Sequence, residues 1–585
     1  MVSFCKMRGY LIVLAAAVAL AGAADMRPTC SKPVYCNSKL LHKVQMARLY
    51  SDSKTFVDLQ MNYDQNTTLN AFDTLLNDTD QEPSVEQLRE FVEKHFSNNS
   101  ELMPWRPPDF NTDPYSLNTI QDDDLREFAR NITNIWPLLA RKVKDEVIQN
   151  PDRYSLIPIT NGFIIPGGRF TEIYYWDTYW IIGGLLISGM QEIAKGIIGN
   201  LIELLNMLGH IPNGSRWYYQ ERSLPPMLTA MVAIYYQYTN DTEFLRNNIA
   251  YLEKGMDFWF DERSVTVEKE GSNHTLLRYF AISSGPRPES YYEDYENAAE
   301  FSEQARTDFF IDIKSAAESG WDFSTRWFVN PDGSNTGTLK DIHTRYIIPV
   351  DLNAIFAGAL QNIANFHVIL GNHRDAVSFS QSAQQWRDSI QSILWNEEEG
   401  MWFDYDIRDQ IHRKYFYPSN LAPLWQGAVD PNIVKANALR ILNNLKQSGA
   451  FDFPGGVPTS LSRSGEQWDF PNVWPPEMSI AVNAIENIGT PEASVLAFET
   501  AQTFVRACHS GFSEYHQMFE KYDAENPGKF GGGGEYNVQY GFGWTNGVVL
   551  EFMKKYGEGM TANDSNELDT TASPSNSSDT SNNAA

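Results

Sequence analysis

The sequence predicts a large, mostly helical protein built from stacked helical hairpins. Apolar residues recur over most of the chain with the period of about 3.6 residues that marks one face of an α-helix. Alternation of apolar and polar residues, which would indicate strands, is limited to short pieces such as 276–281. The predicted helices are joined by alternately short and long connections, a spacing that favours paired helices. We therefore expect an all-α fold.

The clearest helices carry recognisable start and stop signals. A helix is expected over 125–143, with Pro137 as a kink. Residues 351–371 place their apolar side chains on one face, with Asp351 as the expected N-cap and Gly371 as the stop signal.

A later helix begins at Thr490-Pro491 and is expected to run to about Cys508. Cys508 shares its apolar face, so we interpret this cysteine as a buried core residue rather than a nucleophile. Similar periodicity predicts helices over residues 177–208, 225–239, 243–259, 292–318, 374–395, 431–447 and 541–556.

The N-terminal end has the pattern of a signal peptide over residues 1–23. Lys6 and Arg8 precede an apolar run and then small residues suited to cleavage. The apolar run is shorter than the roughly 20 residues that a membrane span requires. In an oxidising compartment, Cys30 and Cys36 can close a short disulfide loop. We expect a secreted protein.

The remaining chain is expected to form a single folded domain over 24–558, followed by a disordered polar tail over 559–585. The tail is rich in Asn, Ser, Thr and Asp and has no hydrophobic ending, which argues against a stable membrane anchor. Sequons for N-glycosylation agree with secretion and occur at Asn66, Asn77, Asn98, Asn131, Asn213, Asn240, Asn273, Asn563 and Asn576.

Charge and aromatic content narrow the possible partners. The 585 residues include 46 Lys and Arg against 74 Asp and Glu, a formal net charge of −28. This balance argues against nucleic acid and anionic membrane surfaces as partners, since both attract basic patches. Aromatic residues make up 13% of the chain, which is compatible with a sugar-binding protein and equally with a storage protein.

Four loop segments mix Arg, Asp and Glu with Trp, Tyr and Gly. A neutral polyol suits this mixture, because charged groups bind hydroxyls and aromatic walls exclude water. One Arg–aromatic pair alone more often indicates a surface cation–π contact, but four such segments favour a binding site. The segments are 166–177, 213–223, 284–289 with 318–323, and 467–476 with 519–520 and 531–536.

Other chemistries find little support. The histidines include no HxxxH or HExxH pair and the cysteines are scattered, so we expect no metal site. The glycine run 531–534 lacks the GK[ST] ending of a phosphate loop, and we interpret it as a flexible flap. There is no G-x-S-x-G nucleophile motif. Carboxylates remain, and glycoside hydrolysis is a reaction that needs only two of them.

Two segments, PGGRFTEIYYWDTYW and QWDFPNVWPP, closely resemble the signature motifs of trehalases, the family that hydrolyses α,α-trehalose to two glucoses. NGSRWYYQERS, SGPRPE, ESGWDF and GGGGEY occur in the family's order, and the resemblance covers about residues 40–558. It implies an (α/α)6 barrel with the active site in long loops at one end. It also implies a disaccharide substrate and no cofactor.

The resemblance assigns roles by position. Asp322 in ESGWDF matches the family's general acid, and Glu520 in MFEKYD matches its general base, although Glu514, Asp523 and Glu525 lie near it. The family's RSQ is Arg-Ser-Leu here, a departure at Leu224. Substrate-binding positions match Arg169, Trp176, Asp177, Asn213, Arg222, Arg287, Glu289, Gly320 and Glu535.

The family inverts the configuration of the sugar, so water must fit between acid and base, with the two carboxyls roughly 6.5–9.5 Å apart. Trp321 and Phe323 are expected to raise the pKa of Asp322 by desolvation. The three arginines among the binding residues would lower a carboxylate pKa, which suits Glu520 more than Asp322.

Two residues carry specific expectations. Asp469, in QWDFP, is interpreted as structural, holding its loop through backbone hydrogen bonds. A substrate-binding Asn213 is incompatible with a glycan, so we expect its sequon to be unused. Competing functions are a glucoamylase-like (α/α)6 glucosidase and a non-catalytic sugar-binding or storage protein. The latter is disfavoured because both candidate catalytic carboxylates are present.

Overall fold

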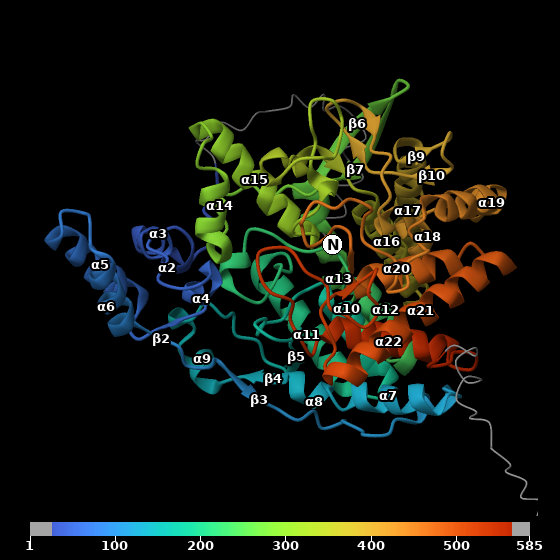
Figure 1. The fold of residues 1–585 in the computed structure, drawn as a ribbon, viewed down its shortest axis with the longest axis horizontal. Helices are drawn as coiled ribbons and strands as arrows, with labels where there is room; N and C mark the ends of the chain where they lie inside the picture. Colours follow the sequence, from blue (N-terminus) through green and yellow to red (C-terminus); the bar gives the residue numbers. More distant parts are fainter. Residues whose placement is uncertain (1–25, 564–585) are drawn as a thin grey trace, which may run out of the picture.

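The computed structural model describes residues 26–563 and shows a mostly helical protein (Figure 1). The predicted signal peptide and residues 564–585 of the predicted tail lie outside the described residues. The helices are α2 Pro33–Cys36, α3 Lys39–Met46, α4 Ser53–Val57, α5 Gln65–Asp78, α6 Val85–His95, α7 Asp123–Thr133, α8 Trp136–Leu139, α9 Asp145–Gln149, α10 Asp177–Ile187, α11 Gln191–Leu208, α12 Leu228–Thr239, α13 Thr242–Arg263, α14 Tyr291–Asn297, α15 Glu303–Ser319, α16 Val350–Leu370, α17 His373–Ile393, α18 Ala422–Trp425, α19 Pro431–Ser448, α20 Pro475–Glu486, α21 Pro491–Tyr515 and α22 Gly543–Tyr556.

The strands are short and pair antiparallel in small sheets of two or three strands. The longest pair, β6 with β7, joins Ser264 to Leu277 at one end and Lys269 to Ser272 at the other. The strands are β1 Gln60–Met61, β2 Phe96–Ser97, β3 Leu102–Pro104, β4 Ala140–Val143, β5 Phe163–Ile164, β6 Ser264–Lys269, β7 Ser272–Leu277, β8 Ile347–Ile348, β9 Trp395–Asn396, β10 Met401–Trp402, β11 Tyr405–Asp406, β12 Ile411–His412, β13 Asn472–Val473 and β14 Tyr522–Asp523.

The centre of the body is a set of helices in successive contact. Here α10 contacts α12, α12 contacts α16, α16 contacts α18, α18 contacts α20, and α20 contacts α22, which in turn contacts α10. Further helices lie against this set, with α11 beside α10 and α12, α17 beside α16, and α21 beside α20 and α22. The α10–α22 approach is very close, since a Cβ at Gly184 would lie 2.8 Å from the Cα of Gly547.

Several predicted helices are confirmed with different boundaries. The residues predicted as 177–208 form α10 and α11, and those predicted as 292–318 form α14 and α15. The helix begun by Thr490 continues to Tyr515, and Cys508 is buried within it, as expected. Gly371 ends α16 with φ +79°.

Two helix predictions were wrong in detail. Asp351 is not the N-cap of α16, which begins at Val350; its carboxylate instead accepts two hydrogen bonds of 2.8 Å from the buried Arg326. The predicted helix over 125–143 ends at Thr133, because residues 140–143 pair as β4 with β3 and β5. Pro137 therefore lies in the first turn of the short α8 and kinks nothing.

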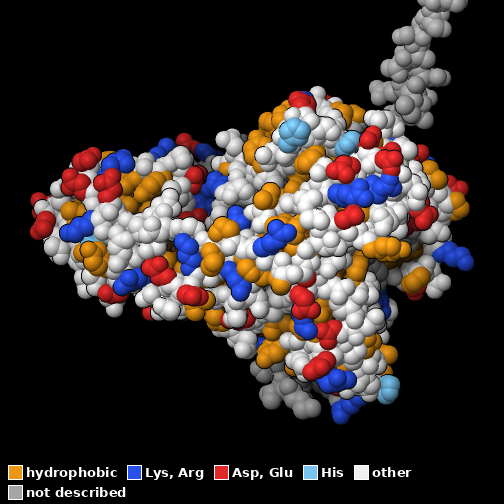
Figure 2. All heavy atoms as spheres, turned by 90° about the horizontal axis from the view of Figure 1, so that it is seen from below, with side chains coloured by type: hydrophobic (Ala, Val, Ile, Leu, Met, Phe, Trp, Pro, Cys, Tyr) orange, Lys and Arg blue, Asp and Glu red, His pale blue; other side chains and the backbone are white. Residues whose placement is uncertain are grey.

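Helices α2–α6 form a lobe at one end of the molecule, drawn in blue in Figure 1 and also projecting from the body in Figure 2. This N-terminal lobe has its own hydrophobic cluster, which includes Phe56 and Phe72 and reaches Tyr218 and Tyr219 of the body. Cys30 and Cys36 form a disulfide within it, with their Cα atoms 5.7 Å apart.

At the other end of the described chain, the first residues of the predicted tail pack on the body. Met560 is buried, and the Arg506 side chain donates hydrogen bonds to the carbonyl oxygens of Thr561 and Asn563. Over residues 26–563, no helix combines the length and apolarity needed to cross a membrane.

Candidate active site

Loops distant in sequence build one cavity. All eleven residues singled out from the sequence line it, together with Trp468, Trp474 and Trp544 and with Asp52 and Lys54 of the N-terminal lobe. The eleven are Asp322, Glu520, Arg169, Trp176, Asp177, Asn213, Arg222, Arg287, Glu289, Gly320 and Glu535. The mixed aromatic and polar lining is typical of a small-molecule site.

Asp322 is delivered to the cavity by the end of α15. The helix ends at Ser319, and Gly320 caps it with φ +85°, a left-handed conformation that glycine adopts without strain. A Cβ at Gly320 would lie 2.7 Å from the Trp176 ring, so the glycine also lets that indole approach. The chain then places Asp322 in the wall of the cavity, which Trp176 also lines.

The surroundings of Asp322 favour its protonated form. Burial, followed by the negative charge of Glu535, raises the pKa of Asp322 to about 7, against the opposing charge of Arg287. Its neighbour Trp321 stacks on Trp468 with ring centroids 5.3 Å apart and lies fully buried. The expected increase in the Asp322 pKa by desolvation is therefore confirmed.

Glu520 lies between α21 and β14 and is tied down through its backbone. Its N–H donates to the carbonyl of Gln539 (3.0 Å), and its own carbonyl accepts from the Trp544 indole (2.9 Å). The carboxylate accepts from the Tyr536 hydroxyl (2.9 Å) and the Gln539 N–H (3.3 Å). Burial raises the pKa of Glu520, whereas Lys521, these two donors and Arg169 lower it.

The three arginines are divided between the two carboxyls. Arg287 and Arg222 lower the pKa of Asp322, and Arg169 lowers that of Glu520. The expectation that all three suit the base was therefore wrong for Arg222 and Arg287. The charge of Arg287 reaches Asp322 because its loop packs against the loop after α15, where the Arg287 guanidinium lies 4.8 Å from the Phe323 ring centroid.

Each arginine is held by acidic partners. Arg287 makes an ion pair with Asp294 (2.6 Å) and another with Glu535 (2.8 Å). Arg222 pairs with Glu221 (2.9 Å) and also with Glu289. Such pairs fix the guanidinium planes of the two arginines, which are each 2% exposed.

Comparison with known proteins places this chain in a family. The family pattern described as Trehalase matches residues 48–557. The chain is 57% identical to a trehalase of Bombyx mori over 560 residues, covering 96% of each chain, and 42% identical to a trehalase of Homo sapiens, covering 94% of each.

The chain belongs to the trehalase family. Its fold is also similar to the solved structure of neutral trehalase from Saccharomyces cerevisiae, with a TM-score of 0.55 and 22% identity over 68% of this chain and 73% of that one. At this identity the likeness supports the fold alone.

Within this trehalase-family site, Asp177 and Asn213 are buried polar residues. The pKa of Asp177, the first residue of α10, is raised well above its ordinary value by burial and by the charges of Glu520 and Asp322. The Asn213 side chain donates to the carbonyl of Ala317 (3.2 Å) and is 6% exposed. Leu224, where the family has Gln, adds an apolar group to the cavity wall.

Sequence reasoning missed Lys521 and Gln467. The Lys521 ammonium donates to the Gln467 side chain (2.9 Å) and lies 4.8 Å from the Trp474 ring centroid. Gln467 in turn donates to the backbone carbonyl of Asp322. Burial lowers the pKa of Lys521 to about 8, although Glu520 and Asp322 oppose that change. Gln467 begins the motif QWDFPNVWPP, and Lys521 follows Glu520 in MFEKYD. Their place within these motifs was the one sequence signal that could have pointed to them.

Asp469 has the structural role expected of it, but most of the donors to its carboxylate are side-chain hydroxyls rather than the expected backbone N–H groups. One backbone N–H, that of Thr325, donates to it at 2.8 Å. The other donors are hydroxyls of Ser324, Thr325, Ser460 and Ser464. Asp469 thereby ties the loop that follows Asp322 to the 460–469 loop.

Proposed function

We propose that this chain hydrolyses α,α-trehalose to two molecules of glucose, with Asp322 as general acid and Glu520 as general base. Family membership supports the reaction. The observation that carries the residue assignment is the contrast between two carboxyls in one cavity. Asp322 has a pKa of about 7, whereas Glu520 accepts two hydrogen bonds and has Lys521 as its neighbour. Burial raises the pKa of both carboxyls, but only at Glu520 do hydrogen-bond donors of other residues and an adjacent ammonium oppose it, and a difference of this kind separates an acid from a base.

In the proposed reaction, Asp322 gives its proton to the glycosidic oxygen as the bond from that oxygen to the anomeric carbon breaks. A water molecule attacks the same carbon from the opposite face, and Glu520 takes its proton. One glucose leaves with the bridging oxygen, and the other carries the oxygen of water with inverted configuration. Proton exchange with solvent then restores Asp322 and Glu520.

The fold proposed with this function is an (α/α)6 barrel. The succession of contacts from α10 through α12, α16, α18, α20 and α22 back to α10 supports it, as does the outer position of α11, α17 and α21. Such a barrel would place the loops that carry Asp322 and Glu520 around one opening.

We also propose that the protein is secreted and glycosylated. The signal-peptide pattern of residues 1–23 and the sequons support this, and the disulfide between Cys30 and Cys36 suits an oxidising compartment.

The purified protein assayed on trehalose, maltose and soluble starch, with glucose as readout, tests the proposed function. We expect turnover of trehalose alone. Faster release of glucose from maltose or starch would favour a glucoamylase-like enzyme, and trehalose binding without turnover would favour a binding or storage protein. In proton NMR, fresh cleavage should yield one α- and one β-glucose, and only α-glucose at early times would contradict inversion.

A further inference from the structure

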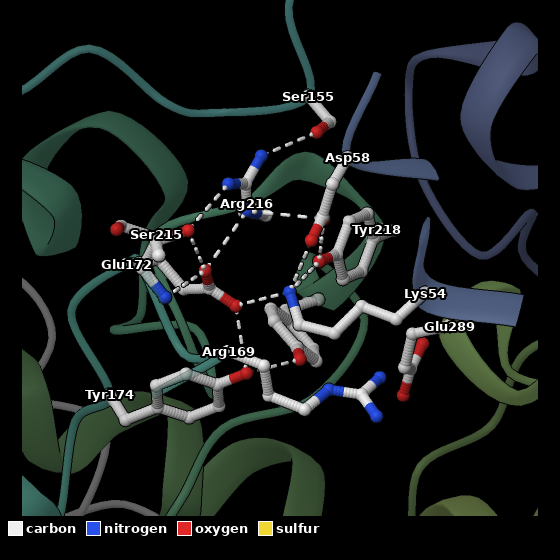
Figure 3. Close-up of polar contacts among 12 residues, drawn as sticks. Lys54, Asp58, Ser155, Arg169, Glu172, Tyr174, Ser215, Arg216, Tyr218 and Glu289 are labelled. Carbon is white, nitrogen blue, oxygen red and sulfur yellow. Dashed lines mark hydrogen bonds and ion pairs between the residues drawn. The ribbon is translucent and has the colours of Figure 1, made fainter. Parts of the chain in front are cut away.

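A buried ionic network lies behind the cavity wall and joins the N-terminal lobe to the loops of the site (Figure 3). Its centre is Glu172, whose side chain is fully buried. One carboxylate oxygen accepts from the Lys54 ammonium and from the Tyr174 hydroxyl, both at 2.8 Å. The other accepts from the Arg216 guanidinium and from the Thr171 N–H, both at 3.1 Å.

This carboxylate is ionised at neutral pH, because it is paired with two buried cations, Lys54 and Arg216. Burial on its own would raise the pKa of Glu172, but the charges of Lys54 and Arg216 hold it below its ordinary value. An ionised carboxylate accepts hydrogen bonds and donates none. The Tyr174 hydroxyl must therefore donate its only proton to Glu172.

The direction of the next hydrogen bond follows. The hydroxyl oxygens of Tyr174 and Tyr219 are 2.7 Å apart. Because the proton of Tyr174 already points to Glu172, Tyr219 is the donor in this contact. The Tyr219 hydroxyl thus donates its only proton to Tyr174, and toward the cavity its oxygen can only accept a hydrogen bond. Tyr174 and Tyr219 both line the cavity.

We propose that Glu172 is a positioning residue: its carboxylate sets the direction of the Tyr174–Tyr219 hydroxyl chain, so that Tyr219 accepts a hydrogen bond from a hydroxyl of the bound disaccharide. The inference rests on the proposed function and deepens it. A site built in this way favours a ligand hydroxyl at that point over an acceptor-only group such as a ring or ether oxygen.

The test uses the two hydroxyls rather than the carboxylate, because Glu172→Gln would remove the counter-charge of two buried cations and endanger folding. Tyr219→Phe removes the acceptor. Tyr174→Phe removes the oxygen that accepts the Tyr219 proton. The Tyr219 hydroxyl can then turn its proton into the cavity and act as a donor there. Each variant should raise KM for trehalose about 10-fold, with a smaller effect on kcat.

The decisive measurement is the double variant. If Tyr174 acts through Tyr219, the double variant should raise KM about 10-fold as well, and not the roughly 100-fold that independent effects would give. A multiplicative effect, or an unchanged KM for Tyr174→Phe, would overturn the proposal.

Tyr218→Phe is the matched control. The Tyr218 hydroxyl belongs to the same network, since it donates to Asp58 (2.7 Å) and accepts from Lys54 (3.0 Å), but Tyr218 does not line the cavity. This variant should lower Tm and leave KM within about twofold of the wild type. An equal rise in KM would show that the network merely supports the fold, and would also overturn the proposal.

Failure of the proposed function is separable from failure of this inference. Wild-type turnover of trehalose tests the former. If turnover is absent, the same set of variants is titrated with trehalose by tryptophan fluorescence, and Kd replaces KM. Multiplicative effects of Tyr174→Phe and Tyr219→Phe on Kd would overturn the positioning role of Glu172 by themselves.

Discussion

At the scale of single residues, Glu520 matches the base in the sequence, but three further carboxylates, Glu514, Asp523 and Glu525, lie close to it along the chain. The structure separates Glu520 from the other three. Glu514 is exposed and pairs with Lys529 (2.7 Å), and Glu525 pairs with Arg463 at the surface (2.7 Å). Glu520 alone of the four lines the cavity. The distinction depends on how the chain turns after the helix, which short flanking motifs do not encode.

Replacing Glu520 by Gln removes the proposed base while nearly preserving its volume. We expect kcat to fall on the order of 10³-fold with the circular dichroism spectrum unchanged. Glu514→Gln is the matched control and should keep wild-type kcat. Wild-type turnover by Glu520→Gln, or an equal loss in the control, would remove Glu520 from the role of base.

Lys521 should set the acid side of the pH profile. Its positive charge lowers the pKa of Glu520, so its removal in Lys521→Met should move the acid limb of kcat/KM to higher pH. The alkaline limb, where Asp322 loses its proton, should lie near pH 7 in the wild type. Lys521→Arg keeps the charge and should restore the acid limb. An acid limb that does not move in Lys521→Met would contradict this account.

At the scale of elements, the helices with one apolar face were predicted, and those with other constraints were not. Helix α20 is buried along nearly its whole length, from Pro475 to Ile485, so no polar face marks its period. Residues 140–143 follow the helical period yet pair as a strand with β3 and β5. Asp351 lies where an N-cap would be expected, but its carboxylate accepts hydrogen bonds from the buried guanidinium of Arg326 instead. Each case was decided by a distant partner.

The backbone conformation at the end of α15 sets the position of Asp322 in the cavity. Ala at Gly320 should cost about 1 kcal/mol through its positive φ and, in addition, push the Trp176 ring out of place. We expect lower stability to urea and a large fall in kcat/KM. Gly371→Ala is the control, because Gly371 caps α16 with φ +79° and a Cβ there meets nothing within 4 Å. It should lose similar stability and keep kcat/KM, and a similar loss of activity would exclude the Trp176 explanation.

At the scale of the whole molecule, the sequence carries a net charge of −28. Acidic and basic side chains alternate over the face seen in Figure 2. The acidic residues that matter for chemistry are instead inside, where burial changes their protonation and therefore the stability of the fold.

Asp322 should make the folded state less stable as pH rises. The unfolded chain releases this proton near pH 3.8 and the folded chain near pH 7, so unfolding is favoured increasingly between these values, by at most about 4 kcal/mol above pH 7. Asp322→Asn cannot ionise and should be inactive but more stable than the wild type at pH 8, with a smaller gain at pH 5. Urea unfolding at both values measures this. A gain that is equal at both would contradict the raised pKa.

Glycan mapping of the secreted protein should find the Asn213 sequon unoccupied. Its amide is buried and bonded to Ala317, whereas the sequon residues Asn98, Asn240 and Asn273 are exposed. These exposed sites are the internal control for efficient glycosylation. A glycan on Asn213 would exclude it from the substrate site.

The sequence by itself determined the helical class, the family and the set of eleven site residues, because helical periodicity and contiguous motifs are local properties. The tertiary structure decided what depends on distance in space. It divided the arginines between Asp322 and Glu520, brought Lys521 and Gln467 to Asp322, and placed Asp52 and Lys54 of the N-terminal lobe at the cavity. Hydrogen bonds and charges act over a few ångströms regardless of sequence separation, and the fold sets those distances.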